Sequence, residues 1–201
     1  MIKNLLLSTA YLPPIDQFAQ ILRHEQLWLE AHENYTRQTY RNRCMIYGPN
    51  GVQRLSIPVI HPGPDQRGIR DIRIDYRVPW QSIHWRSIET AYLRSAFFMY
   101  YADELKQAFF LKQESLWEHN LELLRCLLRI LRMDCVIAMT RTYQKEPEGF
   151  TDLRAHLRLQ QAPMKRYPQV FEPVHGFIPG LSMIDLLFNR GPDSLEYLKE
   201  I

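Results

Sequence analysis

The stretch that decides the fold is "LLLSTAYLPPIDQFAQILRHEQLWLEA", which runs from Leu5 to Ala31. Its opening apolar run predicts a short buried strand, and Pro13 and Pro14 end that strand. Apolar residues then recur at helical spacing, at Ile15, Phe18, Ala19 and Leu22. Proline is tolerated in a first helical turn, where its missing N–H is not needed, so a helix follows directly. Because "LWLEA" predicts a second strand, the stretch predicts a β-α-β unit, which builds parallel sheets.

A β-hairpin is predicted at about residues 40–60, within "TYRNRCMIYGPNGVQRLSIPV". Two strand-like runs flank Asn50-Gly51, and an Asn-Gly pair favours a tight turn because both residues tolerate a positive φ. On the first strand, Arg41 and Arg43 would share one face and Asn42 would take the other. After a loop rich in proline and glycine, the isoleucines of residues 69–74 predict a further short strand.

Helices are predicted for most of the C-terminal half. An apolar stripe predicts one helix from about Trp85, residues 100–110 predict a second, and Ser115 opens a third with a capping box. The continuous apolar run of residues 135–139 predicts a central strand buried on both faces. Residues 143–170 are polar and predict a loop with at most a short helix. A helix capped by Ser182 and a terminal helix complete the chain.

Together these elements predict a single α/β domain over residues 1–201. It combines a mixed β-sheet with the β-hairpin and flanking helices, and its C-terminal half is rich in helices. A length of 201 residues suits one domain with one core.

Composition narrows the class of protein. Lys and Arg number 25 against 22 Asp and Glu, and this small surplus predicts no nucleic-acid partner. Three cysteines without a CxxC spacing fit a reducing compartment. The apolar run near the N-terminus is broken at Ser8 and Thr9, so we interpret it as a buried strand rather than a signal peptide. No run approaches the ~20 apolar residues of a membrane span. We therefore expect a cytoplasmic protein.

Several common catalytic motifs are absent from the sequence. It has no GxxxxGK[ST] phosphate loop, no GxGxxG turn, no HExxH helix and no GxSxG elbow. Its seven histidines never recur at three to five residues, the spacing of a helical metal site. We predict no metal and no cofactor.

Two groups of polar residues are candidates for binding or catalysis. Arg41 and Arg43 could bind a phosphate or carboxylate, and Asn42 could recognise an amide or a sugar hydroxyl. The alternative is a solvated edge strand that its charges protect from pairing. His84 lies just before the helix expected from Trp85, where the helix dipole favours a neutral imidazole suited to a general base. Its alternative is a structural histidine near a cap.

Asp185 and Asn189 are four residues apart and therefore lie on one face of the expected helix after Ser182. They could contact a ligand from that face. The alternative is that Asp185 completes the cap of Ser182 and that Asn189 marks the helix end.

Four motifs occur in the order and style of the WbqC-like proteins, which the chain therefore resembles from Tyr11 to its end. They are "YLPPIDQFAQI", "TYRNRCMIYGPNGVQRLSIPV", "WQSIHWRSIETAY" and "FIPGLSMIDLLFNRGP". The residues that can be placed on the family's pattern are Tyr11, Asn42, Arg43, Trp80, His84, Tyr92, Asp185 and Asn189. The family's usual His-Gln-Pro group is replaced here by Leu7, Ser8 and Thr9.

The resemblance implies a transferase that moves glycine or another aminoacyl group to a nucleotide-linked sugar in bacterial surface-polysaccharide (O-antigen) synthesis. His84 and Asn42 would then be catalytic, and Arg41 and Arg43 would bind substrate. Tyr11, Trp80, Tyr92, Asp185 and Asn189 complete the implied binding residues. The alternative is a non-catalytic binding or interaction protein of a divergent branch, since a histidine is missing near a βα turn, where α/β folds bind ligands. The sequence leaves the oligomeric state open.

Overall fold

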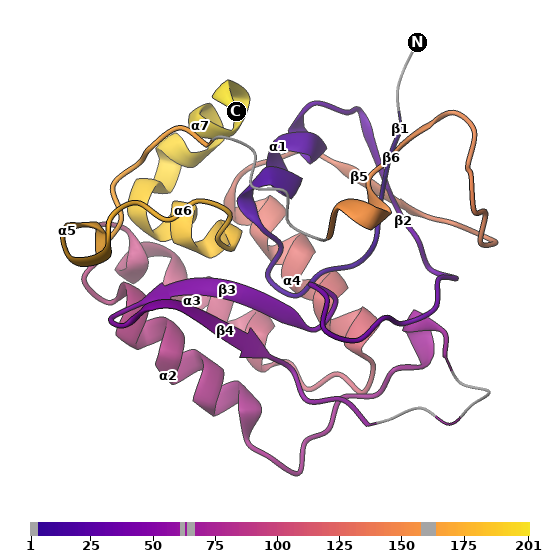
Figure 1. Cartoon of the computed structure of the whole chain (residues 1–201), viewed down its shortest axis with the longest axis horizontal. Helices are drawn as coiled ribbons and strands as arrows, with labels where there is room; N and C mark the ends of the chain where they lie inside the picture. The colour runs from indigo at the N-terminus through magenta and orange to yellow at the C-terminus, as the bar shows by residue number, and fades with distance from the viewer. Residues whose placement is uncertain (1–3, 61–62, 64–66, 158–163) are drawn as a thin grey trace.

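The computed structural model describes residues 4–60, 63, 67–157 and 164–201 and contains two separate sheets (Figure 1). The larger sheet has four parallel strands in the order β5-β2-β1-β6. Its strands are β1 (Asn4–Leu7), β2 (Gln26–Leu29), β5 (Val136–Met139) and β6 (Phe150–Asp152). The smaller sheet is the antiparallel hairpin of β3 (Arg43–Gly48) and β4 (Gly51–Ser56). The predicted α/β class is confirmed, and its parallel and antiparallel pairings are divided between these two sheets.

The β-α-β unit predicted at the N-terminus is confirmed. β1 leads through α1 (Ile15–Leu22) to β2, and Leu5 pairs with Leu27 in parallel register. The prediction of a central strand at residues 135–139 is wrong in position. β5 lies at the edge of the sheet and its Val136 is 64% exposed, while β1 and β2 take the centre. An apolar run therefore did not distinguish an edge strand from a central one.

The two faces of the parallel sheet are covered differently. Leu5, Leu7, Leu27 and Leu29 are buried in the main core. Alternate residues such as Trp28 and Phe150 point to the other face and are only partly buried. Figure 1 shows α1 on one side of the sheet and the chain between β5 and β6 on the other. Parallel sheets usually carry helices on both faces, so this outer face is unusually open.

The hairpin is confirmed, but its first strand starts later than predicted. The ladder runs from Arg43 opposite Ser56 to Gly48 opposite Gly51. Arg41 and Asn42 precede it in a turn, so the expected alternation of faces does not apply, and both side chains are buried. Gly51 has a φ of 95°, which agrees with the turn that the Asn-Gly pair predicts.

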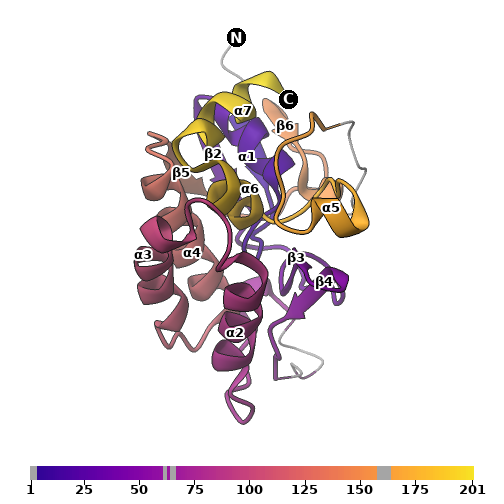
Figure 2. The same cartoon turned by 90° about the vertical axis from the view of Figure 1, so that its left-hand side faces the viewer.

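The helices of the second half are α2 (Trp80–Tyr92), α3 (Phe98–Phe110), α4 (Leu116–Ile130), α5 (Glu172–His175), α6 (Met183–Arg190) and α7 (Ser194–Glu200). Ser115 caps α4, since its Oγ accepts a hydrogen bond from the Trp117 amide. α2 starts five residues before the expected position, directly after Pro79, so His84 lies inside the helix rather than ahead of it. Figure 2 shows the hairpin on one side of α2, and α3 and α4 on the other.

Two further predictions about local structure are wrong in part. Residues 69–74 do not form a continuous strand: Ile69–Asp71 is a 3-10 helix, whereas Arg73 and Ile74 make isolated β-bridges to Ser115 and Val59. Residues 143–170 were expected to form a loop with at most a short helix; the 3-10 helix Arg154–Leu157 agrees with this, but Phe150–Asp152 form the strand β6, which was not predicted. β6 is only three residues long, which is too short for a visible period.

The predicted end of α6 is confirmed, because Gly191 terminates it with a φ of 54°. The cap that was expected from the Ser182 side chain does not form. The Ser182 hydroxyl donates to the Leu12 carbonyl rather than capping the helix. No helix within the described ranges is long and apolar enough to cross a membrane.

Candidate functional site

Apart from Asn42 and Arg43, which lie at the base of the hairpin, the motif residues fall into three separate places. The first is a sealed group that we call the aromatic-histidine cluster, formed by Tyr11, Trp80, His84 and His119. Each side chain is at most 6% exposed. The Tyr11 hydroxyl lies 2.9 Å from His84 Nδ1. The Trp80 ring lies 5.3 Å from the rings of both His84 and His119. This cluster is part of the core beneath the hairpin.

Both histidines of the aromatic-histidine cluster are held neutral by burial. Burial lowers the pKa of His84 from its usual 6.5 to about 4, against a smaller opposite effect of the Ser56 carbonyl. Burial likewise lowers the pKa of His119 to about 4. Within the described ranges, neither His119 ring nitrogen has a hydrogen-bond partner of good geometry, and the Leu111 carbonyl opposes the shift only in part. His84 is 6% exposed and His119 is 0% exposed, so both neutral imidazoles are almost wholly buried.

Asn42 and Arg43 lie at the base of the hairpin. Asn42 Nδ2 donates to the Ile57 carbonyl, and the Ile57 amide donates back to the Asn42 carbonyl. This reciprocal pair continues the hairpin by one step. Arg43 is partly buried and its charge lowers the pKa of Tyr35, against the larger effect of burial. The geometry therefore ties Asn42 to the backbone.

Tyr92, Asp185 and Asn189 occupy the second place, where α2 meets α6. The Asp185 carboxylate is fully buried and accepts from Tyr167 Oη at 2.6 Å and from Gln169 Nε2 at 3.1 Å. Burial raises the pKa of Asp185 to about 6, although its hydrogen bonds act in the opposite direction. Asn189 Nδ2 donates to the Asp185 carbonyl. Asp185 is therefore the centre of a buried network rather than a helix cap, which corrects the capping alternative.

Arg41 occupies the third place, at the carboxyl edge of the parallel sheet. Its Nε donates to Glu33 Oε1 at 2.8 Å and its Nη2 reaches Glu33 Oε2, so the pair is bidentate. Ser8, the first residue after β1, donates to Glu33 and accepts from Arg41. The Arg41 carbonyl also accepts from Asn120 Nδ2. Arg41 is thus locked in a buried ion pair instead of guarding a solvated strand.

The carboxyl edge is also where the strand order reverses. β1 reaches β2 on one side through α1, whereas β6, its neighbour on the other side, arrives from the far edge after β5. In α/β sheets, ligands bind in the crevice outside the carboxyl ends of the strands at such a switch point. Ser8 follows β1 there and Arg154 follows β6. This edge is the candidate functional site.

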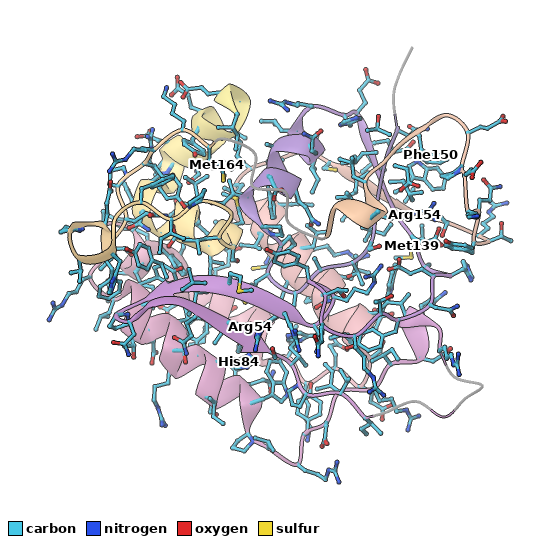
Figure 3. All side chains as sticks on the ribbon, viewed as in Figure 1. Arg54, His84, Met139, Phe150, Arg154 and Met164 are labelled. Carbon is cyan, nitrogen blue, oxygen red and sulfur yellow. The ribbon has the colours of Figure 1, made fainter. Side chains whose placement is uncertain are left out.

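Two open cavities lie at this edge. The switch-point cavity has a volume of about 470 Å³, and its lining includes His32, Glu33, Arg41, Tyr143, Lys145, Asp152 and Arg154. The sheet-face cavity has a volume of about 280 Å³ and is lined by Leu6, Trp28, Glu30, Thr140, Arg141, Thr142, Gln144, Pro147 and Phe150. Arg41 is the one motif residue in either lining. Figure 3 shows Phe150 and Arg154 at the sheet and His84 beneath the hairpin.

A second buried ion pair separates the two cavities. Glu30, the residue after β2, is 1% exposed and accepts from Arg154 Nη1 at 3.0 Å. Glu30 also accepts from the Thr140 hydroxyl at 2.7 Å. Arg154 bonds both oxygens of Asp152, and its guanidinium lies 5.1 Å from the centre of the Tyr143 ring. These bonds hold the ends of three strands in fixed positions.

The sequence contained a signal for part of this edge that motif reasoning missed. Glu30, His32 and Glu33 directly follow the second strand of the predicted β-α-β unit, so they had to lie at its carboxyl edge. Lys145 and Arg154 gave no such signal, because β6 was predicted as loop. In the described part of the chain, no group of three or more His, Cys, Asp or Glu side chains is arranged to hold a metal ion.

Comparison with known proteins assigns the chain to a family. The model of the WbqC-like protein family matches residues 9–148 and 143–197. The uncharacterised protein Rv1507c of Mycobacterium tuberculosis is 27% identical over 230 residues, which cover 99% of this chain and 98% of that protein. No solved structure matches the chain. The family match includes His32, Lys145 and Arg154 of the switch-point cavity as well as the residues of the sealed core.

Proposed function

Since the chain belongs to the WbqC-like protein family, we propose that it transfers a glycyl or other aminoacyl group to a nucleotide-linked sugar in bacterial surface-polysaccharide (O-antigen) synthesis. The observation that carries this proposal is the switch-point cavity, where Lys145, Arg154 and exposed His32 face the carboxylates of Glu33 and Asp152. Nucleotide-linked sugars are anionic, and α/β folds bind ligands at this edge.

The side chains of the cavity suit distinct roles. Lys145 is exposed and free to follow the phosphates as a point charge. Arg154 is held by Asp152 and Glu30, so its guanidinium is fixed in position and its charge is offset by their carboxylates. The carboxylate of Asp152, an exposed residue, can accept a further hydrogen bond from a sugar hydroxyl or an amino group, whereas both Glu33 oxygens are engaged with Arg41 and Ser8. The cavity therefore offers groups for both ends of such a substrate.

His32 is the residue we propose as general base, in place of His84. It is exposed at the cavity, whereas His84 is buried and bonded to Tyr11. In the transfer, the acceptor amine forms a C–N bond to the acyl carbonyl carbon of an activated aminoacyl ester. The ester C–O bond breaks, His32 takes the proton from the amine, and the resulting imidazolium gives this proton to the leaving oxygen. General base catalysis of this kind contributes roughly 10²- to 10⁴-fold to a rate.

A transfer assay with a glycyl ester and a nucleotide-linked amino sugar tests the proposal. We expect His32→Ala to lower kcat/KM by about 100-fold or more while leaving the fold intact, since the side chain is exposed. His175→Ala is the matched control, because His175 is also exposed and lies in α5, far from the parallel sheet (Figure 1). Equal loss in both variants, or no loss in His32→Ala, would contradict the assignment.

A non-catalytic binding protein is the second candidate. The observation that favours it is the replacement of the family's usual His-Gln-Pro group, at the end of β1, by Leu7, Ser8 and Thr9. Ser8, the first residue after β1, is bonded to both Glu33 and Arg41, so its hydroxyl is not free to act as a nucleophile. Binding of nucleotide-linked sugars without turnover of any aminoacyl ester would favour this candidate.

A further inference from the structure

We propose that the sheet-face cavity binds the base of a nucleoside diphosphate, with the phosphates at the cavity mouth. This inference rests on the proposed function in one respect, namely that the substrate is nucleotide-linked. It adds where the nucleoside lies and which side chains recognise it.

The floor of the sheet-face cavity is aromatic. Trp28 and Phe150 lie on the open outer face of the parallel sheet, with ring centres 5.6 Å apart and planes at 81°. Both side chains are partly exposed, whereas Trp80, Trp85 and Trp117 are at most 4% exposed. Any nucleobase can stack on such rings, because every base has a π face.

The carboxylate at the bottom of the cavity is already paired. Glu30 lines the cavity, and its carboxylate accepts from Arg154, which Asp152 also holds, and from Thr140. A neutral ring can lie over this ion pair, whereas an additional phosphate would lie beside a carboxylate. The base is therefore favoured at the bottom and the phosphates are favoured further out.

The wall of the cavity is the chain that follows β5, and its residues alternate between the two cavities. Thr142 and Gln144 line the sheet-face cavity, while Tyr143 and Lys145 line the switch-point cavity. Thr142 and Gln144 are exposed and offer hydroxyl and amide groups to the edge of a base. Arg141 is also exposed in the sheet-face cavity and, with Lys145 across the wall, provides positive charge for a diphosphate.

Tryptophan fluorescence tests the inference directly, because Trp28 is the partly exposed tryptophan. The probes are UDP, GDP, uridine and inorganic pyrophosphate. We expect saturable quenching by UDP and GDP, weaker binding of uridine, and no quenching by pyrophosphate. Trp28→Phe should remove the quenching. Phe150→Leu should weaken UDP binding about tenfold, which corresponds to ~1.4 kcal/mol.

Arg141→Ala keeps the test valid if either floor variant fails to fold, since Arg141 is exposed and packs in no core. Arg141→Ala should weaken the binding of UDP and leave the binding of uridine unchanged. Arg86 is an exposed arginine of α2, and Arg86→Ala should change the binding of neither. Absence of quenching by any nucleotide, or equal affinity for UDP and pyrophosphate, would overturn the inference. Quenching without aminoacyl transfer would instead contradict the proposed function alone. Transfer with an unchanged KM in Phe150→Leu would contradict this inference alone.

Discussion

Two regions of the molecule hold polar side chains away from water in opposite ways. In the aromatic-histidine cluster, His84 and His119 meet rings, a hydroxyl and carbonyl groups, and burial keeps them neutral. At the carboxyl edge of the parallel sheet, Glu33 meets Arg41 and Glu30 meets Arg154, so each charge has a partner. No residue of the aromatic-histidine cluster lines the switch-point cavity or the sheet-face cavity, whereas residues of the sheet edge line both.

A polar residue in a motif can therefore serve the fold alone. Motif residues such as Tyr11, Trp80, His84 and Asp185 are sealed in the interior, where their exact size and hydrogen bonds decide packing. The residues that meet open cavities are mostly outside the quoted motifs. Substitutions in the two regions are expected to lower the free energy of unfolding by different amounts, from several kcal/mol to almost none.

The largest effect is expected at the ion pair of the sheet edge. Arg41→Met leaves the Glu33 carboxylate buried without its bidentate partner, and such a loss costs about 3 to 5 kcal/mol. Denaturant unfolding measures the free energy of unfolding of each variant. The double variant Arg41→Met with Glu33→Leu should recover much of the loss, because no unpaired charge remains. A loss below about 1 kcal/mol in the single variant would show that the pair is not buried as described.

The next effect is a dependence of stability on pH that comes from the sealed cluster. The pKa values of His84 and His119 are about 4 in the folded protein, against 6.5 in the unfolded chain. Between pH 6.5 and about 4 the unfolded chain therefore binds more protons. Stability that is fully present above pH 6.5 is lost as pH falls to about 4, by up to about 3 kcal/mol for each histidine.

Asp185 changes the stability in the opposite direction over the same pH range. Its pKa is raised to about 6, so the folded protein binds the extra proton between pH 6 and about 4 and gains stability as pH falls. Unfolding free energies measured across this range should fall less steeply with acid in His84→Gln and more steeply in Asp185→Asn. Identical slopes in wild type and His84→Gln would show that His84 titrates normally.

A smaller effect is expected for Tyr11→Phe. This change removes the hydroxyl 2.9 Å from His84 Nδ1 and keeps the ring, so a buried nitrogen loses its partner at a cost of about 1 to 3 kcal/mol. Tyr100→Phe is the matched control, because the Tyr100 side chain is 80% exposed. If the two tyrosine variants unfold alike, the hydrogen bond to His84 contributes nothing.

The smallest effect on stability is expected at the open side of the sheet edge. His32→Ala and Lys145→Ala remove exposed side chains and should change the unfolding free energy by less than about 0.5 kcal/mol. The same two changes should weaken binding or transfer of a nucleotide-linked sugar. A large loss of stability in either variant would mean that the residue supports the fold, as the sealed cluster does.

Local signals in the sequence predicted the parts of the fold that local interactions decide. The β-α-β unit, the Asn-Gly turn of the hairpin and the Ser115 cap depend on residues close in sequence, and each is present. The burial of Asp185 depends on Tyr167 and Gln169 from another segment, so the alternative of a capping role was wrong. β6 was missed because three residues carry no period, and the switch point was missed with it.

Hydrogen exchange with and without a nucleotide-linked sugar tests most directly whether the open edge, rather than the sealed cluster, is the functional site. UDP-N-acetylglucosamine is a suitable probe. Added ligand should slow exchange at residues 30–34 and 140–154, which form the cavity walls, and leave residues 80–92 unchanged. Slowing confined to residues 80–92, around His84, would contradict the account.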